Sequence, residues 1–153
     1  MTKTEKILAA YERFGAAIAA IPDERAQALH RTSVGAREFI ANARAQNPRV
    51  TASQVGAGLE QGLRETPGLI QGVAPAWRAQ AAAAFHNAVL SVYPEFMVLE
   101  SERLKKVLAR GKIRSEAEFH RVRYEIDLLE GDSGRKDELS TLYALVDSFE
   151  ARA

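Results

Sequence analysis

Residues 112–150 read KIRSEAEFHRVRYEIDLLEGDSGRKDELSTLYALVDSFE, and this stretch decides the fold class. Apolar side chains recur at the same spacing in both halves, namely Phe119, Val122, Ile126 and Leu129 in the first and Leu139, Leu142, Val146 and Phe149 in the second. This spacing fits the helical period and does not fit a strand. A polar turn, Gly-Asp-Ser-Gly at 131–134, separates the halves. We therefore expect residues 112–151 to form an antiparallel helical hairpin.

Two positions carry the signature of a helix start. Ser115 is followed three residues later by Glu118, and Thr51 is followed three residues later by Gln54. In a capping box of this kind, each side chain satisfies the other residue's unpaired backbone N–H. The pattern predicts a helix beginning after Ser115 and a short helix beginning after Thr51.

The composition of the whole chain favours helices over sheet. The 153 residues include 27 alanines and few Val, Ile and Thr, and this length suits one domain. The absence of cysteine excludes disulfides, thiolate nucleophiles and cysteine-ligated metals. We expect residues 1–153 to form a single all-α domain, a helical bundle of six or seven helices. The bias toward alanine and arginine suggests a bacterial protein, and the lack of cysteine suits the cytoplasm.

Further apolar stripes and breaking residues place the remaining helices. The predicted helical regions are 4–20, 23–45 with a possible break at Gly35, 75–92, and 94–110 ending at Gly111. We expect the first and the last two of these regions to share one core with the hairpin.

Residues 48–75 form a Gly/Pro-rich segment that contains five of the ten glycines and three of the five prolines. Each glycine inside a helix costs about 1 kcal/mol relative to alanine. We therefore expect this segment to be the least regular and most mobile part of the chain. The helix that Thr51 starts is then either weak or tightly packed.

Several functional classes find no support in the residues. The longest apolar stretches are too short to cross a bilayer, and Glu12 and Arg13 split the N-terminal one. The three histidines lack the spacing of metal ligands, and the glycines at 56–62 do not match a phosphate-binding loop. We expect no membrane association, metal or cofactor, and no catalytic residue is assigned.

One run of basic residues is larger than a structural role in a helix would require. Residues 103–114 contain six basic side chains and no acidic one. Cations near a helix C-terminus are favoured by the helix dipole, but six are more than this effect requires. The candidate partner-binding residues are Arg103, Lys106, Arg110, Lys112 and Arg114. We expect Arg103, Lys106 and Arg110 to point outward together, so that reversing their charges leaves the melting temperature nearly unchanged, while Leu104, Val107 and Leu108 face the core.

Three functional hypotheses follow. The first is a non-enzymatic protein that binds another protein, as an adaptor, an antitoxin or an immunity partner. The second is a nucleic-acid-associated regulator that uses the 103–114 patch, although a net charge of +1 is low for that role. The third is an enzyme whose site is assembled from scattered residues, for which we would first test Tyr93, Tyr124, His86, His120 and Arg123.

Overall fold

The computed structural model describes residues 1–130 and 132–152, and this part of the chain contains eight α-helices, a short 3-10 helix and no strand. The helices are α1 (Lys3–Ile18), α2 (Glu24–Val34), α3 (Ala36–Gln46), α4 (Ala52–Ile70), α5 (Pro75–Val92), α6 (Pro94–Arg110), α7 (Glu116–Leu129) and α8 (Lys136–Glu150), with the 3-10 helix η1 (Ser133–Arg135) before α8. The all-α prediction is confirmed. Gly131, part of the predicted turn, and Ala153 lie outside the described residues.

The described residues form eight α-helices where the sequence predicts six or seven, partly because Gly35 divides the region 23–45. Gly35 has φ −90° and ψ 0°, outside the helical region, so α2 ends there and α3 begins. Its N–H donates to the carbonyl of Arg31, and its carbonyl accepts from the N–H of Phe39, which links the two helices through one residue.

The expectation of a less regular segment over residues 48–75 is wrong for most of its length, because α4 runs unbroken from Ala52 to Ile70. Thr51 and Gln54 form the predicted capping box, with bonds of 2.9 and 3.1 Å. Three of the glycines allow close packing: a Cβ at Gly56, Gly62 or Gly68 would press on Thr4, Tyr11 or His120, respectively. The tightly packed alternative is therefore the one observed.

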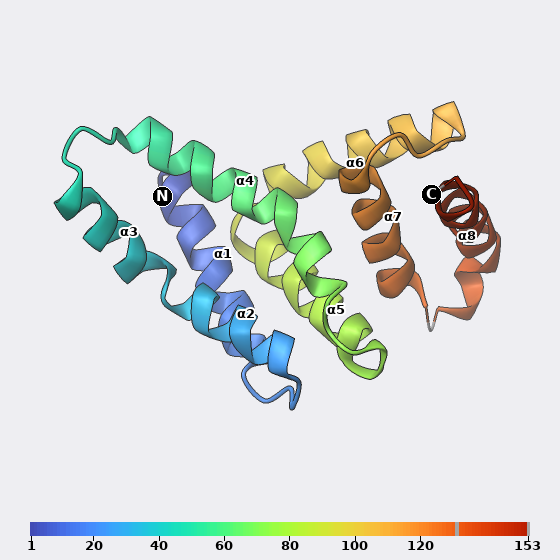
Figure 1. Ribbon diagram of the computed structural model, residues 1–153, viewed down its shortest axis with the longest axis horizontal. Helices are drawn as coiled ribbons and strands as arrows, with labels where there is room; N and C mark the ends of the chain where they lie inside the picture. Colours follow the sequence, from blue (N-terminus) through green and yellow to red (C-terminus); the bar gives the residue numbers. More distant parts are fainter. Residues whose placement is uncertain (131, 153) are drawn as a thin grey trace.

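The main core lies between α1, α4 and α5, which Figure 1 shows side by side in the centre and left of the molecule. Phe14 of α1, Phe85 of α5 and Tyr124 of α7 form a chain of edge-to-face rings with centroids 5.3 and 6.0 Å apart. This geometry is the one aromatic pairs prefer, and all three rings are fully buried.

A second apolar cluster holds the C-terminal helices. Both sequence stripes of residues 112–150 enter it, together with Val107 of α6 and Ile113 of the following loop. In Figure 1, α7 descends to the turn and α8 returns on its far side, at the opposite end of the molecule from α3. The expectation of one shared core is therefore wrong, since the two stripes form a separate cluster and only Tyr124 and Leu128 of α7 join the main core. Within the described residues, no helix has the length and apolar composition needed to cross a bilayer.

Candidate functional site

The basic run of residues 103–114 begins on α6 and continues into the loop before α7. α6 ends at Gly111, whose φ of 72° is the left-handed conformation that glycine adopts at helix ends. Arg103, Lys106 and Arg110 share one face of α6 and line the same cleft, as their spacing predicts. Lys112 and Arg114 lie exposed in the loop, outside the cleft lining.

This basic cleft lies between α4, α6 and α7 and has a volume of about 710 Å³. Five cations and three carboxylates line it: Arg64, Arg103, Lys106, Arg110 and Arg121, with Glu65, Glu100 and Glu118. Leu69, Leu104 and Val107 add apolar surface, and Leu69 is 56% exposed. The cleft therefore combines excess positive charge with exposed apolar surface.

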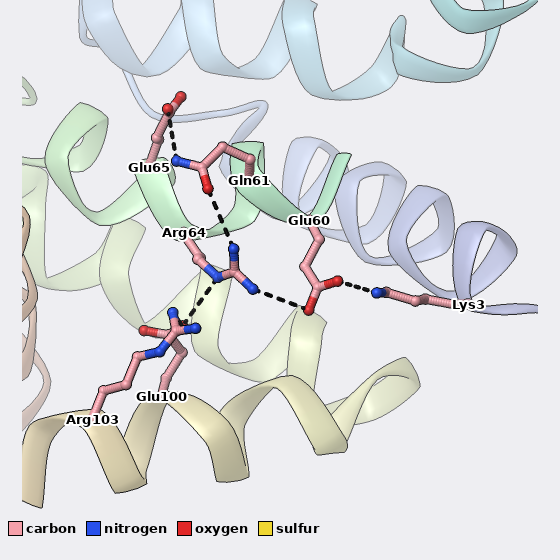
Figure 2. Close-up of polar contacts among 7 residues, drawn as sticks. All are labelled: Lys3, Glu60, Gln61, Arg64, Glu65, Glu100 and Arg103. Carbon is pink, nitrogen blue, oxygen red and sulfur yellow. Dashed lines mark hydrogen bonds and ion pairs between the residues drawn. The ribbon is translucent and has the colours of Figure 1, made fainter. Parts of the chain in front are cut away.

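A ladder of ion pairs joins the helices beside this cleft (Figure 2). Glu60 of α4 pairs with Lys3 of α1 and, at 3.5 Å, with Arg64. Arg64 also lies 4.0 Å from Glu100 of α6, which accepts a 3.0 Å hydrogen bond from Arg103. Glu60 and Glu100 are only 6% and 7% exposed, so each carboxylate needs its cations to offset the cost of burial. The ladder fixes α6 against α4 and thereby shapes one wall of the cleft.

A short series of hydrogen bonds among side chains of α4 lies beside this ladder. Gln61 donates to Glu65 at 3.1 Å and accepts from Arg64 at 3.3 Å (Figure 2). These bonds orient the Arg64 guanidinium from above, while Glu60 and Glu100 hold it from below.

Arg110 acts at the opposite end of the cleft by holding the loop between α6 and α7. Its guanidinium donates to Glu118 at 2.5 Å and to the carbonyl of Lys112 at 2.9 Å. Burial raises the pKa of Glu118, but the bonds from Arg110 and the Arg114 N–H outweigh burial and hold that pKa below its ordinary value. Arg110 is therefore committed to the protein's own loop.

Only one of the two hydrogen bonds of the capping box predicted at Ser115 is present. The Ser115 hydroxyl accepts from the N–H of Glu118 at 3.2 Å, as predicted. The carboxylate of Glu118 instead accepts from the N–H of Arg114, at 2.7 Å, because Arg110 draws it toward the loop.

Lys106 is the cleft cation with the greatest freedom to meet a partner. It is exposed, and among residues 1–130 and 132–152 no carboxylate lies within 4.0 Å of its ammonium group. Arg103 is half exposed and keeps guanidinium donors beyond the one that Glu100 accepts. The charge that the cleft offers outward is therefore centred on Lys106 and Arg103.

The apolar side chains of this part of α6 differ in part from expectation. Val107 is buried and Leu104 is partly buried, but Leu108 is 39% exposed. The prediction that Leu108 faces the core is wrong, because only a narrow strip of α6 reaches the second apolar cluster.

The residues proposed for a scattered enzyme site are placed in different surroundings. His120 lines the basic cleft, His86 lines a separate pocket against α6, and Tyr124 is fully buried. Burial lowers the pKa of His86 and raises that of Tyr124. Arg123 hydrogen-bonds Gln71 on the α4 side. In the part of the chain that the structure describes, no three His, Asp or Glu side chains converge as metal ligands.

Sequence reasoning missed the contributions of α4 and α7 to the cleft. Arg64 and Leu69 line it but lie far along the chain from the basic run, and Arg121 lines it from the next helix. One feature of the sequence could have indicated that Leu69 is exposed, because this residue falls outside the apolar stripe formed by Val55, Leu59 and Leu63. Comparison with known proteins found no matching family model, no matching curated protein and no matching solved structure.

Proposed function

We propose that this chain is a non-enzymatic bacterial protein of the cytoplasm that binds another protein through the basic cleft. The segment it takes is acidic and carries an apolar side chain. Adaptor, antitoxin and immunity roles all fit an activity of this kind.

The observation that carries the proposal is the pairing of exposed cation with exposed apolar surface in one cleft. Leu69 is 56% exposed at the rim, and Lys106 and Arg103 line the wall formed by α6. Protein interfaces combine a desolvated apolar centre with charges that steer encounter. A partner with a leucine-like side chain over Leu69 and a carboxylate toward Lys106 would satisfy both features.

The nucleic-acid alternative draws less support from the same residues. Three of the six cations in the run are paired with carboxylates: Arg103 with Glu100, Lys105 with Glu102, and Arg110 with Glu118. A phosphate backbone would have to compete for these groups, whereas one or two partner carboxylates need only Lys106 and the remaining donors of Arg103.

The test is selection of binding peptides from a displayed random library, followed by affinity measurement on the enriched sequences. We expect enrichment of peptides that combine Asp or Glu with a large apolar residue. The double variant Lys106→Glu/Leu69→Asp should bind them roughly tenfold more weakly, because it removes both the charge and the apolar contact. Lys136→Glu, at the start of α8 and outside the cleft, is the matched control and should bind normally.

Two outcomes would count against the proposal. One is equal binding of the same peptides by the wild type and the double variant. The other is binding of a short DNA or RNA duplex that weakens steeply between about 50 and 200 mM salt, which would favour the regulator instead.

A further inference from the structure

A second surface, which we call the α3–α4 groove, lies at the other end of the molecule from the hairpin. It has a volume of about 750 Å³ and is lined by residues of α3, the first half of α4, and parts of α1 and α2. Figure 1 shows α3 and the start of α4 joined by a loop at the far left of the molecule. The lining is mainly apolar, with Phe39, Ile40, Val50, Val55 and Leu59 as the large side chains.

α3 presents an apolar face that the protein itself buries only in part, since Ile40 packs against the main core but Phe39 stays exposed. All residues of α3 are described, and none of them is buried. Phe39 is 70% exposed, an unusual position for a phenylalanine. Arg37 attaches the helix to α1 through hydrogen bonds to Glu12 at 2.8 and 3.0 Å and to Glu5 at 3.1 and 3.2 Å. Ion pairs and the partly buried Ile40 thus hold α3 in place, while Phe39 remains uncovered.

Gly58 lines this groove from α4, and the fold gives no internal reason for a glycine there. Glycine inside a helix costs about 1 kcal/mol relative to alanine. Gly56 and Gly62 have close neighbours that explain them, but apart from the adjacent backbone of α4 no described atom lies within 4 Å of where a Cβ at Gly58 would stand. A glycine at this point leaves the floor of the groove free of a side chain, so that a partner's backbone can approach closely.

The charges around the groove are of one sign. Arg31 and Arg44 line it, and no carboxylate is among the described residues that line it. Within residues 1–130 and 132–152, neither arginine has a carboxylate within 4.0 Å. An occupant that brings carboxylates to both would gain the pairing that the chain itself does not supply.

From these observations we propose that the α3–α4 groove binds one acidic amphipathic helix of a partner protein. The helix lays its apolar face over Gly58 and against Phe39, and its carboxylates meet Arg31 and Arg44. This is the helix-in-groove mode of recognition. The inference does not rest on the basic cleft, and the two surfaces together would let the protein hold two partners.

The open shape of the groove and its positive charge favour an acidic helix over two other occupants, a fatty acid and a second copy of this chain. A fatty acid would leave much of its tail in water, because the exposed Phe39 shows that the groove is open, whereas a helix needs to bury only one face. A second copy of α3 would carry two arginines, Arg37 and Arg44, and a single carboxylate, Glu38. It would bring them toward the two arginines that line the groove. Like charges facing each other disfavour that pairing.

The experiment uses the whole protein and two displayed libraries of helices of about 18 residues, long enough for five turns. Both randomise one apolar face; one has glutamate on the other face and the second has lysine. We expect the glutamate library alone to yield binders. In fluorescence anisotropy, Gly58→Glu should weaken them roughly tenfold or more, because it fills the floor and adds a negative charge that repels the carboxylates of the bound helix. Phe39→Ala should weaken them by a similar factor.

Controls separate this result from misfolding and from the cleft. Gly58→Glu adds an exposed, helix-favouring side chain, so its circular dichroism should match the wild type and its melting temperature should equal or exceed that of the wild type. Lys106→Glu alters the cleft and should leave binding in the groove unchanged.

Three outcomes would overturn the inference. They are the absence of binders in the glutamate library, equal yield from the lysine library, and unchanged affinity in Gly58→Glu. Displacement of bound helix by a fatty acid, or sedimentation showing a dimer that Gly58→Glu dissociates, would assign the groove to the competing occupants.

Discussion

The phenol of Tyr11 on α1 lies directly against Gly62 on α4. Its hydroxyl donates to the carbonyl of Leu59 at 3.3 Å, and a Cβ at Gly62 would collide with the phenol oxygen. Burial raises the pKa of Tyr11 to about 12, so the hydroxyl keeps its proton at neutral pH. The glycine is therefore the feature that lets α1 and α4 approach at this point.

Gly62→Ala and Gly58→Ala should consequently have different effects on stability. Alanine favours a helix over glycine by about 1 kcal/mol, and Gly58→Ala should gain most of this because its surroundings are open. Gly62→Ala must displace Tyr11 and lose its hydrogen bond, at a cost of about 1 kcal/mol that offsets the gain. Urea unfolding measures the difference. In a Tyr11→Phe background the two substitutions should become more alike; equal effects in the wild-type background would contradict this account.

Amide exchange should distinguish α4 from α3. Leu63 and Ile70 of α4 are fully buried, whereas no residue of α3 is buried. Amides of α4 around these residues should exchange slowly, and those of α3 should exchange orders of magnitude faster through local opening. Comparable protection in both helices would show that the Arg37 ion pairs and the partial burial of Ile40 anchor α3 as firmly as the core anchors α4.

Ile126→Ala should strongly destabilise the C-terminal helices. Ile126 is 1% exposed within the second apolar cluster, and removing such a side chain costs about 2 to 5 kcal/mol. Ser115→Ala removes only the cap of α7 and should cost about 1 kcal/mol. Denaturant melts of both variants test the ranking, and a Ser115 effect as large as that of Ile126 would refute it.

Reversing the charges of Arg103, Lys106 and Arg110 together should lower the melting temperature, contrary to the expectation drawn from the sequence. Arg103 pairs with the buried carboxylate of Glu100, and Arg110 pairs with Glu118. Removing a charged hydrogen-bond donor from such a partner costs about 1.5 to 3 kcal/mol. Lys106→Glu alone should melt like the wild type, and a stable triple variant would show that the two pairs contribute little.

The stability that Asp23 contributes should be lost in acid. Backbone N–H bonds from Ala26 at 2.9 Å and Ala74 at 3.1 Å hold the pKa of this carboxyl below its ordinary value. The contribution is therefore complete above the unfolded-state pKa of about 3.9 and disappears as the pH falls through the lower folded-state pKa. The gap in melting temperature between the wild type and Asp23→Asn should be constant near neutral pH and close below about pH 4. Because hydrogen bonds cause the shift, the closing should persist in high salt; a gap independent of pH would refute the assignment.

The sequence predicted features that depend on near neighbours along the chain. The capping box of Thr51 and Gln54, the break at Gly35 and the end of α6 at Gly111 are confirmed. Each depends on residues within about one helical turn, so the chain carries the whole signal locally.

The candidate site was only partly predictable. The shared face of Arg103, Lys106 and Arg110 follows from helical spacing and is observed. The spacing does not show which of these cations is free to contact a partner, because Arg110 is hydrogen-bonded to Glu118 of the next helix. The α3–α4 groove gave no sequence signal, since exposure of Phe39 depends on what packs over it.

Local patterns along the chain are sufficient to show that it is helical and where most of its helices begin and end, because periodicity and caps act over a few residues. The roles of the glycines of α4 depend on tertiary contacts, since Gly62 meets Tyr11 across a helix interface while Gly58 faces open space. Tertiary contacts also determine which charges are paired, as in the ion pairs of Lys3 with Glu60 and of Arg64 with Glu100. Residues so far apart in the chain meet only when the core has packed, and their pairing leaves no local pattern from which it could be predicted.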